Sequence, residues 1–454
     1  MRANSPMSAA SRRLYFFAAL LGLWAFAICF RLVQLQVFEF GSFMQRAQRQ
    51  QNRTIEVSPR RGNIFDRNGG MLATSISVDS VFAIPSEIPD QEMAATLLGN
   101  VLNTDPAEIL AHLKSSKTFA WVERKVDAET SSRIRAMNLR GIYFQKESKR
   151  FYPKRELAAQ TLGYVGLDDE GLGGLEREFD DDLRGIPGKM LISVDARRKW
   201  FGRVEKQPDP GQNLVLTVDS TIQYIAEREL ERAMGETKAI AGTVIVQNPH
   251  TGEILALANR PTFNPNVFNS VPQAALKNRA VSDVYEPGSV FKVVTLSAAL
   301  DQHLATPEEP IDCQNGSITV FGMRIRDHER LGVVTLAQAL AHSSDVAAIK
   351  IGMRLGNERL DHYIRQYGFG AQTGIELPGE TRGLAKPVNR WSKVSIGAIS
   401  MGQEIGVTPL QIVSMISTIA NDGVYTPPRI VAGALPPNGS PKPDVFHPAL
   451  QRRV

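Results

Sequence analysis

The N-terminal segment constrains the fold most, because a stretch this apolar is stable only inside a core or a membrane. Leu14 to Phe30 is an unbroken run of apolar and small residues, and no acidic residue occurs before Glu39. Apolar residues farther along extend the run to a length that crosses a bilayer as one helix. We therefore predict a tail over 1–13 and a transmembrane anchor over 14–38.

The flanking residues orient this anchor and leave one alternative open. Ala25-Phe26-Ala27 has the form of a signal-peptidase site, so a cleaved signal peptide is the alternative. Retention is favoured because the apolar pattern continues past that site and the bulky Trp24 precedes it. Basic residues before the run predict a single-pass anchor in the inner (cytoplasmic) membrane. The tail would lie in the cytoplasm, and the bulk of the chain would lie on the outer side of that membrane. The basic residues are Arg2, Arg12 and Arg13.

The composition is that of a globular protein and argues against several function classes. The chain has 454 residues, of which 43% are hydrophobic and 22% charged, so there is room for two or three domains. Acidic and basic residues are interspersed at a net charge of +5, which gives no support to a nucleic-acid partner. Cys29 and Cys313 are too few for a disulfide framework. No HExxH or CxxC spacing occurs, so no metal and no other cofactor is expected.

Turn signals divide the rest of the chain. Asn68-Gly69 between two apolar stretches predicts a β-hairpin with a type I′ turn. The break at 207–211, Gln-Pro-Asp-Pro-Gly, is the best domain boundary. We predict an N-terminal β-rich pedestal over 39–207 and a second domain over 211–454.

The second domain begins as strand, helix and hairpin. Asn213 to Asp219 reads as a strand, and Ser220 is expected to cap a helix over Thr221–Met234. Two apolar strands on either side of Pro249–Gly252 read as a hairpin. Helices are also expected over Tyr285–Leu300 and from Thr408-Pro409 to the region of Gly423.

A lysine inside the first of these helices calls for an explanation. Ser289 and Lys292 are three residues apart and share a helix face. Lys292 is the only charged residue between Glu286 and Asp301, and a lone charge in an apolar helix is costly. A desolvated lysine can take the proton of a serine hydroxyl and so activate it as a nucleophile. A surface lysine placed there by chance is the alternative.

Several motifs resemble those of one family. Ser289-Val290-Phe291-Lys292, after Glu286-Pro287-Gly288, is similar to the active-site serine motif of penicillin-binding proteins and serine β-lactamases. Other stretches resemble the pedestal and transpeptidase motifs of class B penicillin-binding proteins; they are 61–69, 150–153, 173–176, 377–380 and 402–411. The pedestal motifs and the Val-Thr-Pro-Leu-Gln stretch at 407–411 look more like the division-specific branch than the elongation branch. The resemblance implies a multidomain α/β fold with a pedestal/dimerisation domain and a transpeptidase domain. The latter would have a central antiparallel sheet covered by helices on both faces.

The resemblance also implies a mechanism. Ser289 would attack the bond between two terminal D-alanines of a peptidoglycan stem peptide, with Lys292 as the base. The backbone N–H of Ser289 would form part of the oxyanion hole. A neighbouring amine would resolve the acyl-enzyme and form the cross-link, and penicillin would acylate the same serine.

The family's second motif, S-x-N, matches Ser343-Ser344-Asp345 with one departure. The resemblance implies that Ser343 relays a proton to the leaving group. An asparagine both donates and accepts hydrogen bonds, whereas an ionised aspartate only accepts and favours a charged lysine. The alternative is that Asp345 only caps a helix.

The family's third motif, K-[ST]-G, does not occur in this sequence. The resemblance places it on a strand of the central sheet, after the helix that Thr408 begins. We therefore expect a C-terminally incomplete chain with an incomplete sheet, and doubtful activity for residues 1–454 alone. Residues 433–454 read as a loop. An inactive natural truncation is the alternative.

The leading hypothesis is a serine DD-transpeptidase of septal wall synthesis that β-lactams inhibit. Its expected partners are stem peptides, a membrane glycan polymerase and other division proteins. A non-catalytic division scaffold and an elongation-specific transpeptidase are the alternatives. A penicillin-binding sensor lacks an output module, and a secreted β-lactamase has no use for the pedestal.

Overall fold

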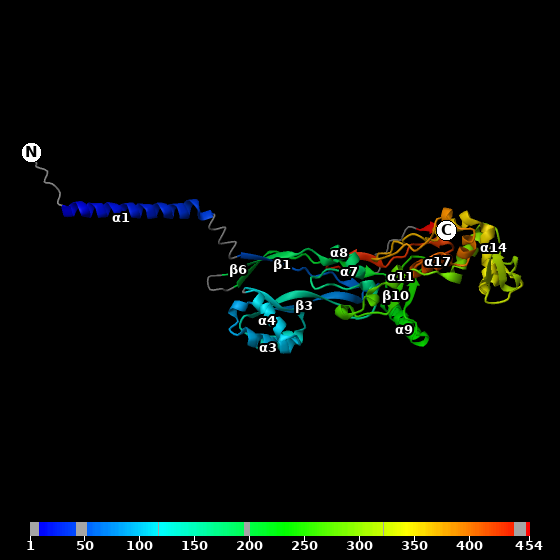
Figure 1. Ribbon diagram of the computed structural model, residues 1–454, viewed down its shortest axis with the longest axis horizontal. Helices are drawn as coiled ribbons and strands as arrows, with labels where there is room; N and C mark the ends of the chain where they lie inside the picture. The colour runs from blue at the N-terminus through cyan, green and yellow to red at the C-terminus, as the bar shows by residue number, and fades with distance from the viewer. Residues whose placement is uncertain (1–8, 42–51, 117, 195–199, 321, 440–450) are drawn as a thin grey trace, which may run out of the picture. The chain divides into compact units, whose positions relative to one another are not determined.

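The computed structural model describes residues 9–41, 52–116, 118–194, 200–320, 322–439 and 451–454 (Figure 1). The chain divides into two compact units. One is made of Met1–Ser58 with Pro187–Asp209, and the other of Pro59–Ile186 with Pro210–Val454. The second unit therefore holds most of the expected pedestal together with the expected transpeptidase domain.

The first unit contains the apolar N-terminal helix and a small sheet. Helix α1 (Ala9–Val33) continues as a π-helical turn, η1 (Gln34–Phe38). The apolar span Leu14–Phe38 is 25 residues long and contains an 18-residue window with a mean hydropathy of 2.2, a length and composition that suit one membrane crossing. Three strands form an antiparallel sheet in the order β1-β6-β7: β1 (Asn52–Val57), β6 (Gly188–Val194) and β7 (Trp200–Lys206).

A six-stranded mixed sheet runs through the second unit. Its order is β16-β8-β2-β3-β4, with β5 paired to β3 as well. The pair β2–β8 is parallel and the others are antiparallel, so this sheet is mixed rather than antiparallel. The strands are β2 (Ile64–Phe65), β3 (Met71–Ala83), β4 (Ala120–Val126), β5 (Ile142–Phe151), β8 (Asn213–Leu216) and β16 (Val431–Leu435).

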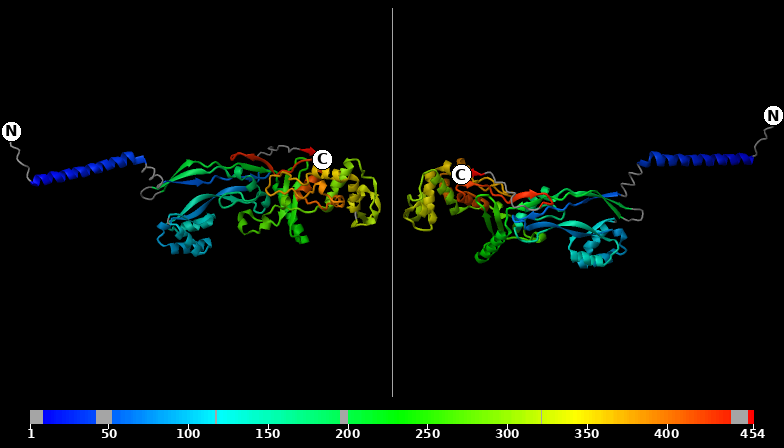
Figure 2. Two further views of the ribbon diagram at one scale, coloured as in Figure 1. Left: turned by 45° about the horizontal axis from the view of Figure 1, so that its top comes forward. Right: turned by 180° about the vertical axis from the view of Figure 1, so that it is seen from behind.

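Helices pack against the C-terminal part of β3 and against β4 and β5. Together they enclose a small, separate hydrophobic core (Figure 2). Aspartates begin three of them, because a carboxylate satisfies free N–H groups at a helix start. Asp90, Asp105 and Asp127 accept hydrogen bonds from backbone N–H groups there. The helices of this half are α3 (Gln91–Leu102), α4 (Pro106–Ser115), α5 (Ala128–Ala136), α6 (Ala159–Leu162), α7 (Gly174–Glu178) and α8 (Asp180–Arg184).

The predicted hairpin joins β2 and β3, but its turn differs from the prediction. Gly69 has φ of 82°, whereas Asn68 is not among the described residues with positive φ. A type I′ turn needs positive φ at both positions, so that prediction was wrong. The side chain of Asp66 instead accepts hydrogen bonds from the N–H groups of Asn68 (3.0 Å) and Gly70 (2.6 Å). Local hydrogen bonding by an aspartate therefore shapes the turn.

The first elements of the transpeptidase half occur in the predicted order, but the predicted N-cap of one helix was wrong. The hairpin of β9 (Gly242–Gln247) and β10 (Ile254–Arg260) is antiparallel, as predicted. Helix α9 (Ser220–Thr237) begins one residue early, because Asp219 rather than Ser220 accepts from the first free N–H groups. Thr408 caps α17 (Pro409–Ala420) through a capping box with Gln411.

Short helices and strands complete this half. The helices are α10 (Gln273–Leu276), α11 (Arg279–Ser282), α12 (Lys292–Asp301), α13 (Leu336–Ala341), α14 (Asp345–Leu355), α15 (Asn357–Gln366) and α16 (Ser395–Ser400). The strands are β11 (Pro310–Asp312), β12 (Ser317–Val320), β13 (Met323–Arg326), β14 (Val333–Thr335), β15 (Val424–Tyr425) and β17 (Arg452–Arg453). Part of the expected loop over 433–454 is therefore strand, since β16 pairs with β8 and β17 with β15. Residues 440–450 lie outside the described residues.

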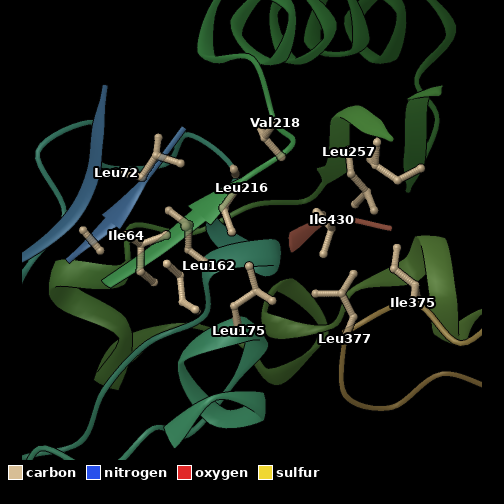
Figure 3. Packing of buried hydrophobic residues seen from close by; sticks show 14 of the residues in the cluster. Ile64, Leu72, Leu162, Leu175, Leu216, Val218, Leu257, Ile375, Leu377 and Ile430 are labelled. Carbon is tan, nitrogen blue, oxygen red and sulfur yellow. The ribbon is translucent and has the colours of Figure 1, made fainter. Parts of the chain in front are cut away.

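One hydrophobic core joins the two halves of the second unit. Leu162 and Leu175 from the pedestal side pack in the same cluster as Leu216, Ile375 and Ile430 (Figure 3). Burial of a leucine or isoleucine side chain contributes about 1.5–3 kcal/mol. The halves are therefore expected to unfold together.

Candidate active site

The serine segment is not the single helix that the sequence predicted. Tyr285 pairs with Val407 in an isolated antiparallel bridge, and the chain then forms a 3-10 turn, η4 (Gly288–Phe291). Helix α12 begins only at Lys292. Ser289 is exposed on the turn, whereas Lys292 is 1% exposed. The nucleophile candidate thus faces solvent and the lysine faces the interior.

The loop that contains Gly402 and Glu404 holds the turn that carries Ser289 in place. The N–H of Gly288 donates to the carbonyl oxygen of Gly402 (3.0 Å). A Cβ at Gly402, where φ is 85°, would lie 2.0 Å from the carbonyl oxygen of Gly288, so only glycine fits there. The N–H of Glu404 donates to Oε1 of Glu286 (2.9 Å). These contacts could not be assigned from the motifs, although glycine in both of them is a signal of close backbone approach.

Lys292 is enclosed by groups from the Ser343 segment. Its Nζ donates to the carbonyl oxygen of Ser343 (2.5 Å) and contacts Oγ of Ser343 (3.0 Å). Nζ also lies 2.7 Å from Oδ1 of Asp345, whose side chain is 24% exposed. Within the described residues no hydrogen bond joins Lys292 to Ser289. Fifty-one residues separate Lys292 and Ser343 in the chain, so the tertiary fold brings them together.

Ser343 adopts a strained backbone conformation. It lies between α13 and α14 with φ of 55°, in the left-handed region where a non-glycine residue is unusual. Its N–H donates to the carbonyl oxygen of Leu340 (2.9 Å), as in a helix C-terminal turn that glycine usually occupies. This conformation directs both its carbonyl and its hydroxyl to the lysine ammonium.

Ser344 and Asp345 have different surroundings. Ser344 is buried, caps α14 by accepting from the N–H of Ala347 (3.1 Å), and donates to Oδ2 of Asp327 (2.6 Å). Ser344 rather than Asp345 is therefore the capping residue, and Asp345 pairs with Lys292. Asp327 was not singled out from the sequence, because nothing local marks a residue 17 positions away.

The fold thus brings Ser343 and Asp345 into contact with Lys292 and leaves Ser289 one turn away. A buried ammonium with a hydroxyl and a carboxylate can exchange protons among the three groups. The exposed hydroxyl at the start of a helix lies near free backbone N–H groups, which favour developing negative charge.

Comparison with known proteins identifies the class. Residues 242–446 match the penicillin-binding protein transpeptidase domain, and residues 56–216 match the penicillin-binding protein dimerisation domain. A crystal structure of penicillin-binding protein 3 from Mycobacterium tuberculosis, complexed with aztreonam, superposes with a TM-score of 0.66 at 28% identity. The superposed region covers 88% of this chain and 72% of the mycobacterial chain. Domains and fold together define a penicillin-binding protein.

Curated relatives narrow the assignment. Stage V sporulation protein D of Bacillus subtilis is 34% identical over 427 residues, covering 92% of this chain and 66% of the relative. Peptidoglycan D,D-transpeptidase FtsI of Escherichia coli K12 is 31% identical, covering 90% of this chain and 71% of FtsI. The chain belongs to the class B penicillin-binding proteins, the peptidoglycan DD-transpeptidase family. It spans less than two thirds of the length of the sporulation protein and more than two thirds of FtsI.

Proposed function

We propose that this protein is a serine DD-transpeptidase that cross-links stem peptides during septal wall synthesis and is acylated by β-lactams. The observation that carries the proposal is the exposed Ser289 one turn from a buried lysine that contacts Ser343. The relative named a D,D-transpeptidase and the structural neighbour complexed with aztreonam support the same activity.

The proposed reaction has two stages. Ser289 Oγ attacks the carbonyl carbon of the penultimate D-alanine and passes its proton to Lys292 in the neutral form. The bond to the terminal D-alanine breaks, and that residue leaves as an amine with a proton relayed through Ser343. An amine from a neighbouring stem peptide then attacks the ester carbonyl, forms the new amide and returns the serine hydroxyl.

One observation favours a second candidate, a non-catalytic scaffold of the same family. The Lys292–Asp345 contact at 2.7 Å favours the charged lysine, which cannot accept the serine proton. A scaffold would keep the fold and its partners without needing a neutral lysine.

Penicillin labelling separates the two candidates. Fluorescent penicillin is expected to label the protein in membranes of cells that carry the gene, and Ser289→Ala should abolish the label because no other group would form the ester. Ser282→Ala, on the half-buried helix before the motif, serves as the control and should keep the label. Absence of labelling in the unmodified protein would favour the scaffold.

The strain at Ser343 allows stability and catalysis to be separated. Ser343→Gly is expected to leave the free energy of unfolding unchanged or raise it by up to about 1 kcal/mol, because glycine adopts positive φ without a Cβ clash. The same change should slow acylation by about a hundredfold, since the relay hydroxyl is lost. Asn103→Gly, at φ of 56° at the end of α3, is the matched control and should not affect acylation. Unchanged acylation in Ser343→Gly would remove Ser343 from the mechanism.

The septal role and the membrane partners are part of the same proposal. A single apolar N-terminal helix supports anchoring in the cytoplasmic membrane with the bulk of the chain outside. A glycan polymerase and other division proteins would contact the anchor and the pedestal. A fluorescent fusion should concentrate at the septum, and a lateral distribution would favour an elongation role.

A further inference from the structure

A cavity lies beside the segment that carries Ser289. Its volume is about 860 Å³, and its walls come from Val284–Glu286, 382–387 and 404–406, with Arg365, Gly370 and Arg390. Cavities of this size accommodate a short peptide or a drug-sized molecule. Glu286 lines this cavity and also belongs to the motif that carries Ser289. The mechanism proposed above makes no use of the hollow.

Two arginines at this cavity have no side-chain partner in the part of the chain that the structure describes. Arg382 and Arg390 are exposed, and within the described residues neither guanidinium makes an ion pair or hydrogen bond. The other two basic residues are compensated. Arg365 lies 3.3 Å from Asp361, and Lys386 lies 3.7 Å from Glu404. Free guanidinium groups in a concave site are suited to carboxylates, which they bind with two parallel hydrogen bonds.

Apolar side chains lie exposed along the same cavity. Leu384 is 69% exposed, Tyr285 45% and Val284 38%. Backbone hydrogen bonds fix the segments that carry them, since the N–H of Leu384 donates to Gly406 O (2.7 Å) and the N–H of Tyr285 to Val407 O (3.1 Å). Exposed apolar surface in a hollow marks a site for a ligand that is partly apolar.

The position of the cavity points to one kind of ligand. Glu286 is three residues from Ser289, and an extended chain covers at most about 3.6 Å per residue, so the near wall lies within about 11 Å of the serine. A peptide whose reacting bond is at Ser289 can therefore reach the cavity with residues a few positions away. Glu286 and Glu404 line the serine end and would repel a polyanion such as a nucleic acid.

We propose that this cavity binds an acidic segment of the peptide substrate, and that Arg382 and Arg390 pair with its free carboxylates. Leu384 and Tyr285 cover the apolar parts of the same segment. The site selects stem peptides with a free carboxylate over peptides in which that group is amidated. The inference rests on the proposed peptide substrate, but the selection can be measured without catalysis.

Binding to the full-length Ser289→Ala protein tests this selection. The probes are a fluorescent peptide that ends in D-Ala-D-Ala with one free carboxylate upstream, and its amidated twin. The acidic peptide is expected to bind about tenfold more tightly. The double variant Arg382→Gln/Arg390→Gln in the same background should lose this preference. Arg359→Gln, an exposed arginine on α15 outside the cavity, should keep it.

The outcomes distinguish this inference from the proposed function. Equal binding of the two peptides, or a preference that survives the double variant, overturns the inference whatever penicillin labelling shows. If the preference depends on the two arginines while penicillin does not label the unmodified protein, the cavity stands and the catalytic proposal fails. If both hold, the double variant with Ser289 intact should label with penicillin at the unmodified rate, because the small ring does not reach the arginines.

Discussion

Glu176→Gln is expected to lower the free energy of unfolding by about 3–5 kcal/mol, because it removes the carboxylate that pairs with two buried arginines. The carboxylate of Glu176 accepts from Nε of Arg61 (2.6 Å) and from Nε of Arg150 (2.6 Å). The side chains are 0% exposed for Glu176, 2% for Arg61 and 3% for Arg150. Burial by itself would lower the pKa of Arg61, but Glu176 and Asp180 outweigh it and hold the pKa above its ordinary value.

The glutamine keeps the shape of the side chain, so the loss would come from charge rather than from a cavity. Urea unfolding of the detergent-solubilised protein, followed by tryptophan fluorescence, measures the effect. Glu178→Gln, two residues away and exposed, should change stability by no more than about 0.5 kcal/mol. A loss below about 1 kcal/mol for Glu176→Gln would mean that water reaches the arginines.

Asp345→Asn should make acylation by penicillin faster at neutral pH, by about tenfold or more. Oδ1 of Asp345 lies 2.7 Å from Nζ of Lys292, and a carboxylate at that distance favours the charged ammonium. The proposed base is the neutral lysine, so a carboxylate in contact with Nζ opposes transfer of the serine proton. Replacing it by a neutral amide, which donates as well as accepts hydrogen bonds, should therefore raise the acylation rate.

Stopped-flow acylation with a fluorescent penicillin at neutral pH measures this rate. Glu329→Gln is the matched control, because Glu329 pairs with His342 next to the site and does not contact Lys292. It should leave the rate nearly unchanged, since exposed charges are screened. Slower acylation in Asp345→Asn would show instead that the carboxylate takes part in proton transfer. An unchanged rate would exclude Asp345 from the site.

Local signals account for the parts of the fold that could be predicted. The hairpin over 242–260, the Thr408 cap and the apolar helix at the N-terminus depend on residues close together in the chain. Two of the errors were also local, and each of these arose where a neighbouring side chain competed. Asp66 displaced the type I′ turn, and Asp219 displaced Ser220 as the cap, because a carboxylate accepts from two N–H groups at once.

For the candidate site, resemblance supplied the residues but not their arrangement. Ser289, Lys292 and Ser343 could be named from motifs, and their roles stay predictions. That Ser289 lies on a 3-10 turn depends on Gly402, more than 100 positions away in the chain. The two free arginines gave no signal in the sequence, because an unpaired charge can be recognised only after the partners of its neighbours are known.

The sequence by itself determined the membrane-type helix, the strand–helix–hairpin order over 213–260 and the family, because each depends on short-range pattern or on motifs read in order. Only the tertiary structure decided that Asp345 rather than a solvent molecule contacts Lys292, and that Glu176 lies between Arg61 and Arg150. These contacts join residues 26 to 115 positions apart, and burial fixes them. No periodicity or local propensity encodes which buried charged side chains contact each other.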